Sequence, residues 1–167
     1  MKKKGLFFAL LICLCAGTTG GSVYAWLIDR EEAKNIVRFA GNDIHIQEEF
    51  NPPQDPDPGD VIAKRPCITN DSETDVFVRV MVRFSDSDAM EQCEPLSINS
   101  GWNLKKDGYY YYDEKLHAGE STNEIFDNIV IKRTVKKEEL LPFDVLVYAE
   151  SVQAYGFSEA QEAFDTL

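Results

Sequence analysis

Histidine and cysteine are the residue types in this chain with the most chemical potential. His45 and His117 stand in unrelated contexts, and the sequence contains no HExxH motif, which would place two zinc ligands on one helical face. It also contains no GxSxG nucleophile elbow, no GxGxxG turn and no phosphate-binding P-loop. Because no catalytic motif is present, we expect no enzymatic activity, no cofactor and no resident metal.

Cys67 and Cys93 are the cysteines that lie outside the N-terminal segment. In an exported protein a disulfide between them would close a loop of about 25 residues and contribute about 3 kcal/mol of stability, if their geometry permits the bond. The alternatives are two unpaired thiols, or a thiol nucleophile beside a histidine, which pairing or burial outweighs. We take Cys67 and Cys93 as a candidate disulfide.

Acidic side chains outnumber basic ones, with 29 Asp and Glu against 17 Lys and Arg and a formal net charge of -12. Such a chain repels phosphate backbones, so no nucleic-acid partner is expected. Two groups have closely spaced oxygens that suit Ca²⁺, namely Asp55, Asp57 and Asp60, and Asp86 with Asp88. Both lack the glycine and the final glutamate of an EF-hand loop, which favours solvated acidic loops.

The elements that must position these side chains follow a period of two residues. The clearest alternation covers 76–84, and a second long one covers 143–150. Shorter β-rich runs bounded by turn residues occupy 35–39, 43–48, 61–69, 108–112 and 128–132. One of these runs contains Tyr109–Tyr112, which offers a carbohydrate or partner surface. A strand whose aromatic rings pack on both faces is the favoured interpretation.

Turn residues and weak helical signals complete the pattern. Gly41-Asn42-Asp43 predicts a hairpin over 35–48, and the prolines of 51–60 predict a surface loop. Helix is restricted to a short turn at 87–93 and to 158–164, where Ser158 is the expected cap. Many short strands between turns predict an all-β fold, an antiparallel β-sandwich with one or two short helices.

Residues 1–25 have the composition of a signal peptide, with a positive start, an apolar stretch and then small residues. Val23-Tyr24-Ala25 suits a signal peptidase, so we place the cut between Ala25 and Trp26. An uncleaved membrane anchor is the alternative. We therefore expect a secreted protein at the cell surface or in the extracellular matrix, with a transient or retained membrane segment. Its predicted parts are a signal peptide (1–25), an N-terminal arm (26–34) and a β-sandwich domain (35–167).

The arm begins with a short, mostly apolar segment, Trp26, Leu27, Ile28, Asp29 and Arg30, and a charged stretch separates it from the first predicted strand. Such a segment can complete a sheet edge in its own domain or in a neighbouring molecule. An ordinary edge strand or a frayed terminus is the alternative interpretation.

Motifs along almost the whole chain resemble the TasA and camelysin family of Gram-positive secreted proteins, whose signal peptides depend on SipW, and in particular its short BsaA-like members. The matching segments are 20–29 at the cleavage region, 35–46, 58–70, 77–80, 101–102, 108–112, 118–126 and 148–157. Each motif is short, and their order and spacing together carry the resemblance. The sequence departs from the family at Leu27-Ile28, where relatives often have Phe-Thr or Phe-Asn, and in its pair of cysteines.

The resemblance implies a jelly-roll-like β-sandwich that is exported, trimmed by a dedicated signal peptidase and assembled into biofilm-matrix or pilus-like fibres. It gives 26–30 the role of a donor strand that completes the sheet of the next subunit. The expected partners are then other copies of this chain or related matrix subunits. A camelysin-like metallopeptidase is one alternative function, and a surface accessory protein that binds a matrix polymer without polymerising is another.

Overall fold

The computed structural model describes residues 43–167. The predicted signal peptide, the cleavage site at Ala25 and Trp26, the arm and the run at 35–39 all lie outside the described residues. Of the predicted hairpin over 35–48, only the second strand can therefore be compared with the structure.

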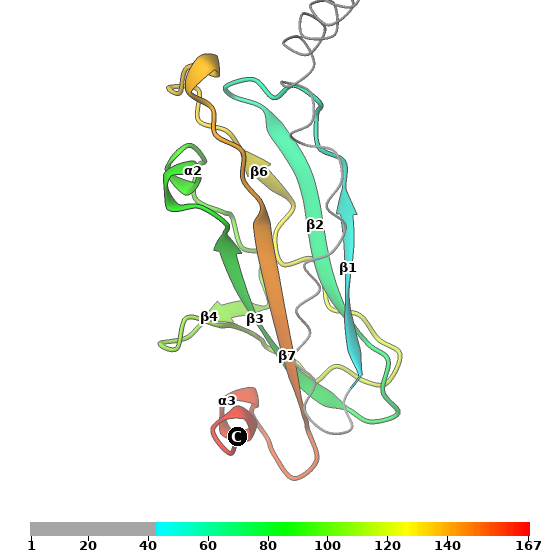
Figure 1. Ribbon diagram of the computed structural model, residues 1–167. Helices are drawn as coiled ribbons and strands as arrows, with labels where there is room; N and C mark the ends of the chain where they lie inside the picture. The colour runs from blue at the N-terminus through cyan, green and yellow to red at the C-terminus, as the bar shows by residue number, and fades with distance from the viewer. Residues whose placement is uncertain (1–42) are drawn as a thin grey trace, which may run out of the picture. The chain divides into compact units, whose positions relative to one another are not determined.

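Two antiparallel sheets make up the described part of the chain (Figure 1). One has the strand order β1-β2-β6 and the other β4-β5-β3-β7. The strands are β1 (Ile44–Phe50), β2 (Val61–Asn70), β3 (Val76–Phe84), β4 (Trp102–Leu104), β5 (Tyr110–Tyr112), β6 (Asn128–Val130) and β7 (Val145–Gln153). This arrangement confirms the predicted all-β sandwich.

Helical structure in the described residues is short, as predicted. It consists of α2 (Ser87–Glu91), the 3-10 turn η1 (Lys137–Glu139) and α3 (Ala160–Phe164). Asp86 caps α2, where its carboxylate accepts hydrogen bonds from the backbone N–H groups of Asp88 and Ala89. The predicted cap of the last helix is wrong, because α3 begins after Glu159 and no side chain caps it.

The main core lies between the two sheets and explains why the strands alternate. Even-numbered residues of β3 lie beside odd-numbered residues of β7 on the inner face of one sheet. Across the sandwich they meet the apolar residues of β2 in the other sheet. Phe126, Ile68 and Val78 are among the side chains fully buried there. A second cluster packs on the outer face of the β4-β5-β3-β7 sheet, where Phe77 and Tyr111 meet Phe164 of α3.

A buried asparagine organises the corner at which the chain passes from one sheet to the other. Asn70 ends β2, and after a link of five residues β3 begins in the opposite sheet. The Asn70 amide donates to the carbonyl groups of Thr74 (2.8 Å) and Leu116 (3.0 Å), and its oxygen accepts from Ser72. Because every polar atom of this side chain has a partner, its full burial is tolerated.

Candidate functional site

Four strands lie at sheet edges among residues 43–167, and two of them are long: β1 has seven residues and β7 has nine, whereas β4 and β6 have three each. β7 pairs with β3 along its whole length, from Val145 opposite Phe84 to Gln153 opposite Val76. No other described strand pairs with β7, and in the second sheet β1 likewise pairs with β2 alone. β1 and β7 also lie in contact with each other. Both sheets therefore end on the same side of the sandwich, within residues 43–167.

The composition of β7 lacks the features that usually protect an edge strand from pairing with another chain. Natural edge strands avoid pairing with other chains by being short, by carrying charges or proline, or by being covered. β7 is nine residues long, contains no proline and carries a single charged residue, Glu150. Val145, Val147 and Ala149 direct its inner face into the main core. Such a strand is a template for a further strand unless another segment covers it.

Ionic contacts occupy the other edge. Glu48 of β1 accepts a hydrogen bond from the Lys64 ammonium at 2.6 Å, and Glu49 contacts Arg65 at 3.0 Å. The Lys64 ammonium also lies 4.5 Å from the centre of the Phe50 ring. Charged side chains of this kind discourage edge-to-edge pairing. We therefore take β7 as the better acceptor of the two edges.

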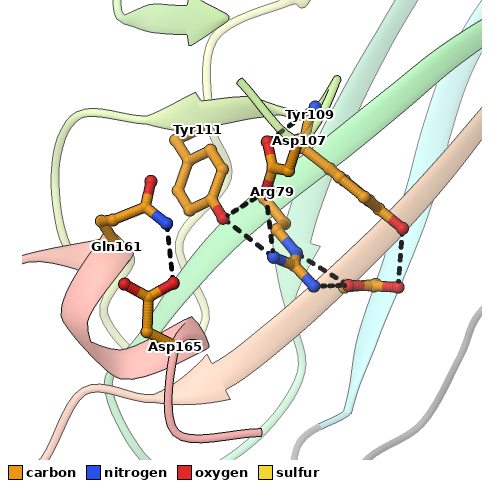
Figure 2. Close-up of polar contacts among 7 residues, drawn as sticks. Arg79, Asp107, Tyr109, Tyr111, Gln161 and Asp165 are labelled. Carbon is orange, nitrogen blue, oxygen red and sulfur yellow. Dashed lines mark hydrogen bonds and ion pairs between the residues drawn. The ribbon is translucent and has the colours of Figure 1, made fainter. Parts of the chain in front are cut away.

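A polar cluster around Arg79 fixes β7 in its sheet (Figure 2). Arg79 lies opposite Glu150 in the β3–β7 register, and its guanidinium contacts the Glu150 carboxylate at 2.7 and 2.8 Å. It also donates to the Tyr111 hydroxyl at 2.8 Å and lies 3.3 Å from Asp107. The Tyr109 hydroxyl donates to Glu150 at 3.1 Å. The one charged residue of β7 is thus bound by the neighbouring strand.

Aromatic rings enclose the same guanidinium. Its central carbon lies 4.3 Å from the centres of both the Tyr109 and the Phe164 rings, and Phe164 meets Tyr111 edge-on at 5.6 Å. Stacking on ring faces is favourable for a guanidinium. These contacts explain how α3, which has only five residues and no side-chain cap, stays on the sheet.

The electrostatics of the Arg79 cluster indicate a structural role. Burial opposes the charge on Arg79, but hydrogen bonds with Tyr111 and Glu150 outweigh it and raise the pKa of the guanidinium above its usual value. Burial raises the pKa of Tyr111, and also that of Tyr109. Both phenols therefore stay protonated at neutral pH. The members of the cluster bind one another, which is the pattern of a packing device rather than of a catalytic centre.

The two histidines are engaged separately. His45 Nδ1 lies 2.5 Å from Asp71 Oδ2, and His117 Nδ1 lies 2.9 Å from Asp75 Oδ1. Among the described residues, no three His, Cys, Asp or Glu side chains come together in a way that would hold a metal ion.

The acidic loop between β1 and β2 has a cation supplied by the chain itself. The Lys137 ammonium lies 2.8 Å from carboxylate oxygens of both Asp55 and Asp57. Hydrogen bonds with these two carboxylates raise the pKa of Lys137. These two carboxylates are therefore paired with a lysine of the same chain.

Cys67 and Cys93 are free thiols in the structure. Cys67 is half-buried on β2, on the strand face opposite that of Ile68, whereas Cys93 belongs to the main core. Burial raises the pKa of Cys67, and it raises the pKa of Cys93 to about 11. Neither thiol is thus activated as a nucleophile at neutral pH. The structure does not bring the two sulfurs together in a bond, and the disulfide stays a prediction.

The tyrosine run packs on both faces of the sheet, as the favoured interpretation expected. Tyr110 and Tyr112 pack against the main core, whereas Tyr109 and Tyr111 belong to the second cluster. These rings are consequently not a free platform. The sequence reasoning missed the Arg79 cluster, although one signal pointed to it: Arg79 and Glu150 are charged residues in the middle of two apolar strands.

Comparisons of this chain with family models, with curated proteins and with solved structures find no match. Among the described residues, no helix is long and apolar enough to cross a membrane. The sheet edge at β7 is the feature on which a functional interpretation rests.

Proposed function

We propose that this chain is a secreted structural subunit of an extracellular matrix or pilus-like fibre, assembled by strand addition at a sheet edge. The observation that supports the proposal is β7, a nine-residue, mostly apolar strand that ends its sheet within the described residues and whose one charged residue, Glu150, is bound by Arg79 of the neighbouring strand. An added strand beside β7 would extend the sheet through backbone hydrogen bonds, and the alternating side chains of the added strand would extend the packing on both faces of the sheet.

The proposed donor is the segment 26–30, which signal cleavage between Ala25 and Trp26 would leave at the N-terminus. Trp26, Leu27 and Ile28 supply the apolar side chains that a completed sheet would bury. A contact between this segment of one subunit and β7 of the next is heterologous, and heterologous contacts that do not close into a ring generate open filaments. The partners are then other copies of the chain or related matrix subunits.

Electron microscopy of four purified chains tests this function. The chain 26–167 should form filaments, whereas a chain that begins at Glu31 should stay monomeric with an unchanged far-UV circular dichroism spectrum. A matched pair of substitutions in the donor refines the test: Ile28→Pro should prevent filaments because proline removes a backbone donor, whereas Ile28→Val should preserve them.

Two results would contradict the proposal. Monomers in every sample would exclude self-assembly and would favour an accessory role for the chain. Filaments in every sample, the chain beginning at Glu31 included, would show that the segment 26–30 is not the donor.

A further inference from the structure

A tyrosine is displayed to solvent at the end of β7, on a turn whose neighbouring residues are anchored. The Phe157 N–H donates to the Ala154 carbonyl at 3.2 Å, which closes a turn with Tyr155 and Gly156 at its centre. Gly156 has a φ of 87°, as the third residue of a type II turn requires. Ala154 and Phe157 pack in the second cluster. Tyr155, between them, is 94% exposed.

Exposure of this ring is not a consequence of a loose loop. The Ala154 N–H donates to the Asp75 carbonyl at 2.9 Å, so the turn is also tied to the corner that precedes β3. A tyrosine on an anchored backbone turn offers a flat apolar face at a small cost in conformational entropy, because its side chain has only two torsions. This is the way in which proteins present aromatic rings for binding.

The ring borders a hollow of about 790 Å³, within the size range of small-ligand sites. Segments far apart in the sequence form its wall: the corner before β3, residue 115, and the stretch from the end of β7 into α3, which lies beside the C-terminus (Figure 1). The polar side chains of the wall are Thr74, Asp75, Lys115, Gln153, Ser158 and Glu162.

The chemistry of this wall selects a class of ligand. Hydroxyl, amide and carboxylate groups together donate to and accept from a partner that carries many hydroxyl groups. An exposed ring face, negative at its centre, attracts the slightly positive C–H groups of a pyranose ring. Two carboxylates against one ammonium, in a chain of net charge -12, disfavour an anionic partner.

We propose that the Tyr155 turn and its hollow form a binding site for a neutral or amino-sugar polysaccharide, with a pyranose ring stacked on Tyr155 and its hydroxyl groups bound by Gln153 and Glu162. The site does not depend on fibre assembly, because all of its residues belong to one chain. It replaces the tyrosine run of β5 as the place where the chain would bind a polymer, since the rings of that run are packed.

Titration calorimetry of the full chain with three soluble hexasaccharides tests the site. Cellohexaose represents neutral glucans, chitohexaose represents amino-sugar polymers, and hexagalacturonate is the anionic comparison. We expect a dissociation constant of about 1 mM or lower for at least one of the first two probes and weaker binding of the third. Whichever of the first two binds more tightly identifies the source of the polymer.

Substitutions distinguish the contribution of the Tyr155 ring face to binding from general effects of changing an exposed side chain. Tyr155→Ala should weaken binding at least about tenfold, whereas Tyr155→Phe, which keeps the ring, should bind within about twofold of the original chain. Leu104→Ala is the matched control, because Leu104 is also exposed but does not line the hollow. It should leave binding unchanged. None of these side chains is buried, so the fold should tolerate each change.

Several outcomes would overturn the proposal. The first is that neither neutral probe gives a heat of binding up to about 10 mM. The second is that the Tyr155→Ala chain binds as tightly as the original, or that Tyr155→Phe loses as much affinity as Tyr155→Ala. The third is that hexagalacturonate binds more tightly than the other two probes. Since assembly is not measured here, failure of this site would leave the fibre proposal standing, and loss of filaments would leave this site standing.

Discussion

Replacement of Arg79 by methionine should destabilise the chain far more than the same replacement at a surface ion pair. Methionine keeps apolar bulk between the rings of Tyr109 and Phe164, so the main loss is the partner of Glu150. Breaking a buried pair by removing one partner costs about 3–5 kcal/mol. Because the side chains of Arg79 and Glu150 keep 18% and 14% of their exposure, we expect the lower end, about 3 kcal/mol.

Urea unfolding followed by circular dichroism measures this difference. With a slope of about 2 kcal/mol per molar urea, the midpoint of Arg79→Met should fall by about 1.5 M. Arg65→Met is the control: the Arg65–Glu49 pair has a similar distance, but its side chains are 46% and 71% exposed. Its midpoint should move by less than about 0.5 M, since exposed pairs contribute at most about 1 kcal/mol.

A double substitution checks that the stability lost in Arg79→Met arises from the Glu150 carboxylate that it leaves without a partner. Glu150→Gln removes the carboxylate charge that Arg79→Met leaves without a partner. The chain with both changes should be more stable than the sum of the single effects predicts, by about 1–3 kcal/mol. Equal midpoint shifts for Arg79→Met and Arg65→Met, or strictly additive effects in the double variant, would refute the argument that this cluster holds β7 in place.

Two further predictions concern titration. In native protein at about pH 7.5, iodoacetamide should leave Cys93 unmodified because the side chain is buried and the pKa of its thiol is raised. In guanidinium without reductant, protection of both Cys67 and Cys93 would show the predicted disulfide, whereas alkylation of both would contradict it. The hydrogen bond that His117 donates to Asp75 raises the pKa of His117, so the NMR titration midpoint of His117 should lie above about 6.5 and fall in Asp75→Asn. Any stabilisation from the His117–Asp75 pair is complete at a pH below the pKa of His117 in the unfolded chain, and it disappears as the pH rises through the pKa of His117 in the folded chain. His117→Gln should therefore lower the urea midpoint at about pH 6 and not at about pH 9.

Strands with strong alternation could be predicted from the sequence, because their pattern is local. The interval 76–84 matches β3 at both ends, and 143–150 predicts β7 with an error of a few residues at each end. The three-residue β4 was missed. Its strand character comes from pairing with β5, which opposes Trp102 to Tyr112, rather than from a period of its own.

The sites depend on contacts that no local pattern encodes. Arg79 and Glu150 are separated by 71 positions, and Tyr111 joins them from a third strand. The sequence marked the tyrosine run as a possible surface but could not show that both of its faces are covered. It likewise gave no weight to Tyr155, because exposure on an anchored turn follows from the packing of Ala154 and Phe157 and not from spacing.

The register between β3 and β7 has a mechanical consequence. Nine residue pairs join these strands in antiparallel order, with Arg79 opposite Glu150 near the middle. Tension applied along the strands loads all of the backbone hydrogen bonds at once, in shear, whereas tension across them breaks the bonds one after another. Sliding β7 by two residues would keep its faces but would pull Glu150 away from its arginine. In a filament that transmits load along β7, the Arg79–Glu150 ion pair would therefore resist slippage near the middle of the longest strand pair among the described residues.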